Sequence, residues 1–164
     1  MTSLQRITTE YVELEDRIRL TGEVEDGTAR SFWLTRRLLD RLIPHLTLWL
    51  ERQHAGLPRA DLMLEFAQQK AQSQFVPQVP VKPPNMQGHL IQAVDITPNI
   101  EQLYLHFKSE SGEAASIGFA STPLRQWLAI LHQAYSVAEW PMSVWPNWLL
   151  ETRQPVSVAK TSWH

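Results

Sequence analysis

The chain resembles itself at a fixed offset of 85 residues, and this repeat restricts the folds open to it. When residues 17–46 are laid on residues 102–131 without a gap, seven of the 30 aligned pairs are identical. Most other apolar positions match in kind. Two copies of a unit this long predict one duplicated supersecondary unit and no long solenoid. The identical pairs are Leu20/Leu105, Glu25/Glu110, Gly27/Gly112, Ala29/Ala114, Ser31/Ser116, Leu39/Leu124 and Leu46/Leu131.

Each copy begins with residues in which apolar and polar side chains alternate, over 17–24 and over 102–108. A period of two is typical of a half-buried antiparallel strand. A turn containing Gly27 or Gly112 follows, and then a second apolar run. We therefore predict a β-hairpin in each copy.

The length of the hairpin loop decides which side chains share a face. A three-residue loop with its glycine in the left-handed conformation pairs Leu20 with Phe32 and Leu105 with Ile117. This register gives one apolar face in each copy, so we prefer it to a two-residue loop. It places Trp33 on the outer face, opposite Arg19.

After each hairpin the apolar spacing becomes helical, over residues 39–50 and 124–135. Pro44 predicts a kink or a division of the first helix near Ile43. The second helix is expected to begin with Thr122 as N-cap and Pro123 as its first residue. A leading strand is expected before each hairpin, at residues 11–14 and 90–96.

The predicted fold class is therefore α+β, with an internally duplicated β-β-β-α unit. Its strands form an antiparallel sheet or a partly open barrel, with helices packed on one face. Four regions follow from this interpretation. They are a first repeat with an extra helix (1–72), a proline-rich connector (73–88), a second repeat (89–139) and a tail rich in tryptophan and proline (140–164).

Composition excludes several classes of function. The 164 residues include no cysteine, so there is no disulfide, thiolate metal site or thiol nucleophile. The formal net charge of -2 gives no general attraction to nucleic acid or to anionic membranes. We find no apolar signal segment and no stretch of about 20 apolar residues. The chain is thus expected to be cytoplasmic, with no membrane partner.

No pattern of catalytic or metal-binding residues emerges. The six histidines show no metal-ligand spacing, and the six glycines are isolated, so no loop cradles phosphate. His106 and Ser116 are cross-strand neighbours in the predicted register, but no acidic residue orients the histidine. We predict no catalytic residue, no metal and no cofactor.

Basic side chains cluster on one side of the first predicted helix. Positions 37, 41, 45 and 52 share a side that lies away from the leucine stripe. The cluster can be a solvated helix face, or it can bind an anion or nucleic acid. The candidates for such binding are Arg30, Arg36, Arg37, Arg41, His45 and Arg52.

Seven tryptophans are many for a chain of this size, and four follow residue 139. These rings either pack within the subunit or form the centre of a protein interface. The interface candidates are Trp33, Trp140, Trp145 and Trp148.

The leading hypothesis is a non-enzymatic protein-interaction or assembly module, whose partner is a second copy in a homodimer or another protein. The alternative is an anion-binding or nucleic-acid-binding protein that uses the arginine-rich face. A third hypothesis is an enzyme with a composite pocket between the two repeats.

Overall fold

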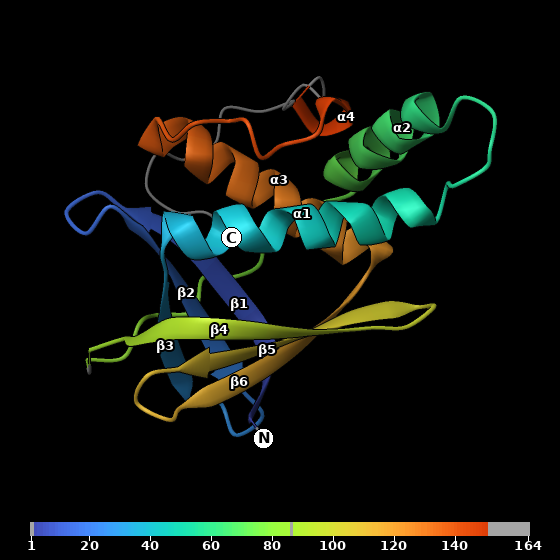
Figure 1. Cartoon of the computed structure of the whole chain (residues 1–164). Coiled ribbons are helices and arrows are strands. Elements are labelled where there is room, and N and C mark those ends of the chain that lie inside the picture. Colours follow the sequence, from blue (N-terminus) through green and yellow to red (C-terminus); the bar gives the residue numbers. More distant parts are fainter. Residues whose placement is uncertain (1, 86, 151–164) are drawn as a thin grey trace.

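The fold combines helices and strands in two consecutive sets of the same order (Figure 1). A computed structural model describes residues 2–85 and 87–150. The elements are β1 (Thr2–Val12), β2 (Arg17–Val24), β3 (Ala29–Leu34), α1 (Arg36–Arg52), α2 (Ala60–Ser73), β4 (His89–Pro98), β5 (Gln102–Ser109), β6 (Ala114–Ala120), α3 (Ser121–Ala138) and α4 (Asn147–Leu150).

The fold class is α+β, as predicted. The six strands close into a barrel in the order β1-β2-β3-β4-β5-β6, where we expected an antiparallel sheet or a partly open barrel. Within each half the strands are antiparallel, whereas β3–β4 and β1–β6 are parallel. Each parallel joint pairs only two residues on each strand. Closure gives every strand a neighbour on both sides, but the short parallel joints leave most of one edge of β1 and of β4 without a strand partner among the described residues.

Both hairpins have the predicted register. Leu20 pairs with Phe32, and Leu105 pairs with Ile117. Gly27 has a φ of 86° and Gly112 a φ of 90°, which is the left-handed conformation that the three-residue loop requires. The alternation of apolar residues was therefore sufficient to select the loop type.

We expect Gly27→Ala and Gly112→Ala each to lower the free energy of unfolding by about 1 kcal/mol. A Cβ at either position meets no atom within 4 Å, so the cost is conformational and not steric. Urea unfolding of the two variants measures it. Unchanged midpoints would show that these turns tolerate alanine without strain.

The first strand of each half carries an irregularity at a corresponding point. The pairing register shifts between Leu4 and Arg6 in β1, and between Ile91 and Ala93 in β4. β1 is much longer than the expected strand at residues 11–14, and it ends before Glu13. The sequence did not predict residues 2–10 as a strand, because polar and apolar side chains do not alternate there. Polar residues of β1 such as Thr8 are buried on the outer face, as described below.

Helix α1 continues through Pro44, so the predicted division of the helix near Ile43 is wrong. Pro44 itself is exposed, whereas apolar residues on both sides of it are buried, including Leu39, Ile43 and Leu46. Their burial outweighs the roughly 3 kcal/mol that an interior proline costs. The Thr47 hydroxyl also donates to the Ile43 carbonyl at 3.1 Å.

Helix α3 begins earlier than predicted. Its N-cap is Ala120, which supplies no side-chain hydrogen bond, and Pro123 lies inside the first turn. A proline is tolerated there because the first backbone N–H groups of a helix have no intrahelical acceptor.

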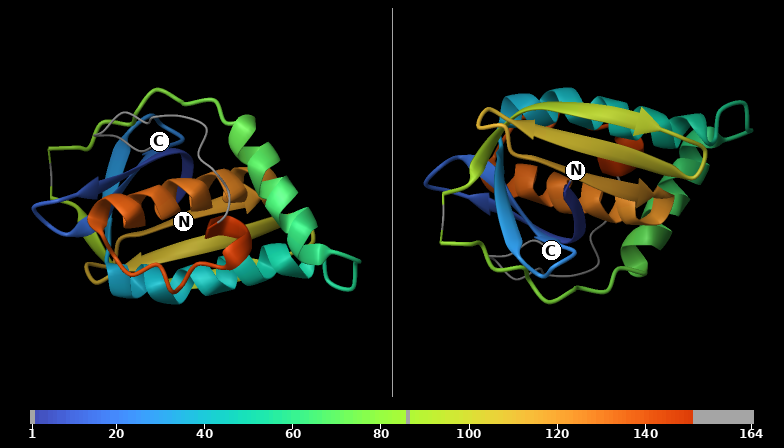
Figure 2. Two further views of the ribbon diagram at one scale, coloured as in Figure 1. Left: turned by 90° about the horizontal axis from the view of Figure 1, so that it is seen from above. Right: turned by 90° about the horizontal axis from the view of Figure 1, so that it is seen from below.

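One apolar core joins the barrel to the helices. It contains fully buried residues of β2, α1, β5 and α3, among them Leu20, Leu46, Leu105 and Leu128. The helices lie together on one side of the strands (Figure 1). Seen from above, α1 and α3 run beside each other, and α2 crosses near their ends (Figure 2).

Candidate functional site

The connector after α2 lies against the first half of the barrel. Its described residues form no helix or strand beyond Gln74, as its prolines predict. Val81 is 5% exposed, and its backbone N–H donates to the Thr8 hydroxyl of β1 at 2.8 Å. The connector is therefore ordered across the outer face of β1 at this point.

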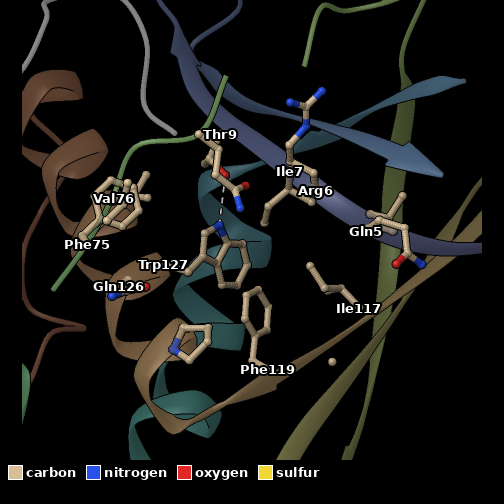
Figure 3. A pocket seen from close by; sticks show the side chains of 15 residues that line it. Gln5, Arg6, Ile7, Thr9, Phe75, Val76, Ile117, Phe119, Gln126 and Trp127 are labelled. Atoms are coloured by element: carbon tan, nitrogen blue, oxygen red, sulfur yellow. Dashed lines mark hydrogen bonds between the residues drawn. The ribbon is translucent and has the colours of Figure 1, made fainter. Parts of the chain in front are cut away.

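A pocket of about 250 Å³ lies where α3, β1, β6 and the connector meet (Figure 3). Trp127 stacks on Phe119 with ring centroids 5.1 Å apart, and its indole N–H donates to the Thr9 hydroxyl at 3.0 Å. Phe75 and Val76 of the connector form the third wall. The described lining contains no carboxylate and no histidine, so it offers no acid-base pair.

A second hollow, of about 270 Å³, lies between α1 and β4, and we call it the α1–β4 seam. It is lined by Leu38, Arg41, Leu42, His45, Gln92, Ala93, Val94 and Ile96.

The seam and the α3–β1 pocket occupy corresponding places in the two halves. Four residues of α1 line the seam, and the residues 85 positions later in the sequence belong to α3 and line the pocket. For the strands the offset is 87, because Thr9 pairs with Leu20 and Ile96 pairs with Leu105. All eight lining residues of the seam thus have a counterpart in the pocket. The counterparts are Pro123, Gln126, Trp127, Ile130, Gln5, Arg6, Ile7 and Thr9.

The two places differ in their third wall. Phe75, Val76 and Gln78 of the connector line one side of the pocket, whereas no other segment of residues 2–85 or 87–150 lines the seam. The outer faces of strands β1 and β4 also differ in burial. Thr8 is 4% exposed beneath the connector, but the corresponding residue Asp95 is exposed and pairs with Lys108 at 2.5 Å.

Strand β4 also has a free edge along the seam. Among the described residues, β4 pairs with β3 only at His89 and Leu90. From Gln92 onward its backbone groups have no strand partner on the α1 side. Such an edge can accept an added strand.

The predicted basic cluster is partly assembled. Arg37, Arg41, His45 and Arg52 are exposed on one side of α1, and none has an ion-pair partner in the described chain. Arg36 instead pairs with Asp40 at 3.3 Å.

Arg30 does not belong to this cluster. It lies at the hairpin end of β3, and its Nη1 is 2.5 Å from Glu113 Oε2. Arg41 and His45 line the seam, and Arg52 lines a further hollow beyond it, next to Ile100. The basic face therefore flanks the seam along α1.

The tryptophans proposed for an interface are buried within the subunit. Trp140, Trp145 and Trp148 are each at most 6% exposed. Trp140 and Trp145 contact the Tyr135 ring edge to face, at 5.0 and 5.3 Å. Trp33 faces outward as predicted, beneath the Arg17 guanidinium at 4.6 Å, but it is only 9% exposed. Trp163 lies outside the described residues.

The rings after α3 are anchored by polar bonds as well. Asp16 accepts from both the Trp140 indole N–H at 3.0 Å and the Tyr11 hydroxyl at 2.6 Å. The bond to Asp16 raises the pKa of Tyr11 to about 12 and lowers the pKa of Asp16. The Trp148 indole N–H donates to Glu51 at 2.9 Å. This part of the tail is thus fixed to both the barrel and α1.

His106 and Ser116 are cross-strand neighbours, and sequence reasoning missed the acid beside them. Asp95 of β4 lies opposite His106, so an Asp-His-Ser row crosses the barrel surface. The row is not connected as a triad. Asp95 bonds to Lys108, and the Ser116 hydroxyl donates to the Thr2 carbonyl at 3.4 Å. Nothing in these contacts activates the serine.

A buried arginine was also missed. Arg125 of α3 is 4% exposed, and burial lowers its pKa to about 10. Its Nη2 lies 3.5 Å from His54 Nε2, while its Nη1 has no hydrogen-bond partner in the described chain. Burial, with the neighbouring Arg125 charge, lowers the pKa of His54 as well. Nothing in the sequence around Arg125 indicated that this residue of α3 would face the core.

Within residues 2–85 and 87–150, no three histidine or acidic side chains gather as a metal site. None of the helices in these residues combines the length and apolarity needed to cross a bilayer. Comparisons with protein-family models, with curated proteins and with solved structures gave no match. The function must therefore be argued from the geometry.

Proposed function

We propose that this chain is a non-enzymatic protein-interaction module that binds an extended segment of a partner protein in the α1–β4 seam. One observation carries the proposal. In the corresponding place of the first half, the connector, an extended segment of the chain itself, forms one wall of the pocket, whereas the seam lacks such a wall in the described residues. The partner segment takes the position in the second half that the connector takes in the first.

The same proposal accounts for the repeat. Two copies of one β-β-β-α unit, derived by duplication, place two similar grooves on the barrel. In one groove a segment of the chain itself forms the third wall. The other has an unpaired strand edge and an apolar floor with no such segment beside them, and these are the features that strand-addition partners use.

Exposed apolar side chains along the seam support a docking role. Ile100 is 95% exposed and lines the hollow beyond the seam together with Arg52. Leu48, four residues before Arg52 on α1, is 41% exposed. Apolar surface beside an unpaired strand edge is a recurrent feature of binding grooves.

Random-peptide display on the full chain tests the proposal. Because the chain has no cysteine, Ala93→Cys creates a single thiol in the exposed wall of the seam. We expect peptides that bind the unmodified Ala93→Cys protein and lose binding when a bulky maleimide is attached there. Gln69→Cys, on the exposed side of α2, is the matched control and should bind with or without its adduct.

Two outcomes would contradict the proposal. No enriched peptide, or peptides that bind equally well after the Ala93→Cys protein is blocked, would remove the seam as a docking site. Retention on oligonucleotides at low salt that is lost in an Arg37→Ala, Arg41→Ala double variant would favour the nucleic-acid alternative.

A further inference from the structure

Resting on that proposed function, we infer that the partner segment is acidic, with carboxylates at every second position and apolar residues between them. The wall formed by α1 has a line of cations that nothing in the described chain neutralises. Among residues 2–85 and 87–150, Arg37, Arg41 and Arg52 have no ion-pair partner, and His45 lies between Arg41 and Arg52. No carboxylate lines the seam.

The spacing of these basic side chains matches the period of an extended chain. Arg37, Arg41 and His45 follow one another at intervals of four residues, which is about 6 Å along a helix. Same-side residues of a strand are about 6.6 Å apart. Carboxylates at alternate positions therefore meet successive basic side chains of α1, and the intervening side chains face the apolar residues Val94 and Ile96.

The length of the segment follows in the same way. From Leu38 to Arg52 the seam and the hollow beyond it extend about 21 Å along α1, at about 1.5 Å per residue. An extended segment of about six residues covers this distance. The corresponding covering segment of the connector, from Phe75 to Val81, has a similar length.

Comparison with the α3–β1 pocket shows which features are specific to the seam. The positions of Arg41 and His45 are occupied there by Gln126 and Ile130, which carry no charge. The connector that covers them has no acidic residue between Gln74 and Pro84. Of the two helices, only α1 presents basic side chains to its groove, and Arg6, which also lines the α3–β1 pocket, is paired with Glu23 at 2.9 Å. Unpaired basic side chains on the seam are what charge complementarity with an acidic partner requires.

The test uses the peptides enriched on the full chain in the display experiment. We expect their consensus to alternate acidic and apolar residues. A synthetic peptide of that consensus, measured by fluorescence anisotropy, should bind an Arg37→Glu, Arg41→Glu variant about tenfold more weakly or worse. Its affinity for the unaltered protein should also fall as salt is raised.

A control with the same change in charge is available at α2, whose N-cap residue is Arg59. Arg59→Glu with Lys70→Glu reverses two exposed cations away from the seam, and binding should change less than about twofold. The seam variant is expected to fold, because glutamates near the start of α1 favour the helix dipole.

The outcomes separate the two proposals. Peptides that require an open seam but lack carboxylates, or that bind the Arg37→Glu, Arg41→Glu variant unchanged, would overturn the acidic assignment and leave the docking function intact. If light scattering finds a dimer that the Ala93→Cys adduct dissociates, the occupant is a second copy and the acidic partner is wrong. If no peptide requires an open seam, both proposals fail.

Discussion

A chain that ends at Glu139 should lose cooperative folding. This truncation removes Trp140, Trp145 and Trp148, which are each almost completely buried, together with Leu149, which is 1% exposed. A tryptophan buries about 150–250 Å². At about 25 cal/mol per Å², three such rings contribute at most about 11–19 kcal/mol, which matches or exceeds the total stability of a typical domain.

The truncation also uncovers Tyr135. Its ring is fully buried under Trp140 and Trp145, and its hydroxyl donates to Asp40 at 2.7 Å. Burial, together with this hydrogen bond, raises the pKa of Tyr135, so the hydroxyl remains a donor. Without the rings, this apolar surface at the end of α3 is open to solvent and to other chains, which favours aggregation.

Circular dichroism during urea unfolding and size-exclusion chromatography measure the effect. A chain ending at Leu150 is the matched control, because it keeps all three rings and their partners. We expect the control to unfold cooperatively. A truncation at Glu139 that stays monodisperse, with the unfolding midpoint of the control, would show that these rings add little to the core.

The alternation of side chains predicted the hairpins well, because local register depends on nearby residues. Leu20 and Phe32 are separated by one short loop, so the apolar pattern and Gly27 together determine their pairing. The apolar face of α1 was predicted for the same reason, because its spacing is a local property of the sequence. The division of α1 at Pro44 was predicted wrongly because the free-energy cost of an interior proline can be judged locally, whereas the burial that outweighs it depends on tertiary packing.

Closure of the barrel and the two grooves could not be predicted in this way. The parallel joints link residues far apart in sequence, such as Thr2 with Ala115 and Phe32 with His89. Their two-residue length leaves no periodic signal. The third wall of the α3–β1 pocket depends on where the connector lies, and composition only showed that this segment is extended. The basic face was visible from spacing, but its position beside a free strand edge was not.

Trp127→Ala should lower the free energy of unfolding by about 3–5 kcal/mol and release the connector from the first half. The ring is 3% exposed, stacks on Phe119 and holds the Thr9 hydroxyl, so its removal leaves a cavity beneath the connector. Leucine occupies the corresponding position in α1, at Leu42. Trp127→Leu should therefore be the milder change, because it refills part of the volume and loses mainly the stack and the indole hydrogen bond.

Hydrogen exchange at the Val81 amide shows whether docking of the connector on β1 depends on the Trp127 ring. That N–H donates to Thr8, so its protection reports the docked connector. In Trp127→Ala, Val81 should exchange faster than amides of β5 such as that of Leu105. Leu42→Ala is the control at the corresponding position, and it should lower global stability without a selective effect at Val81. Equal losses of protection at Val81 and Leu105 in Trp127→Ala would show that the connector docks independently of the ring. The first groove would then not serve as the structural precedent for a segment bound in the seam.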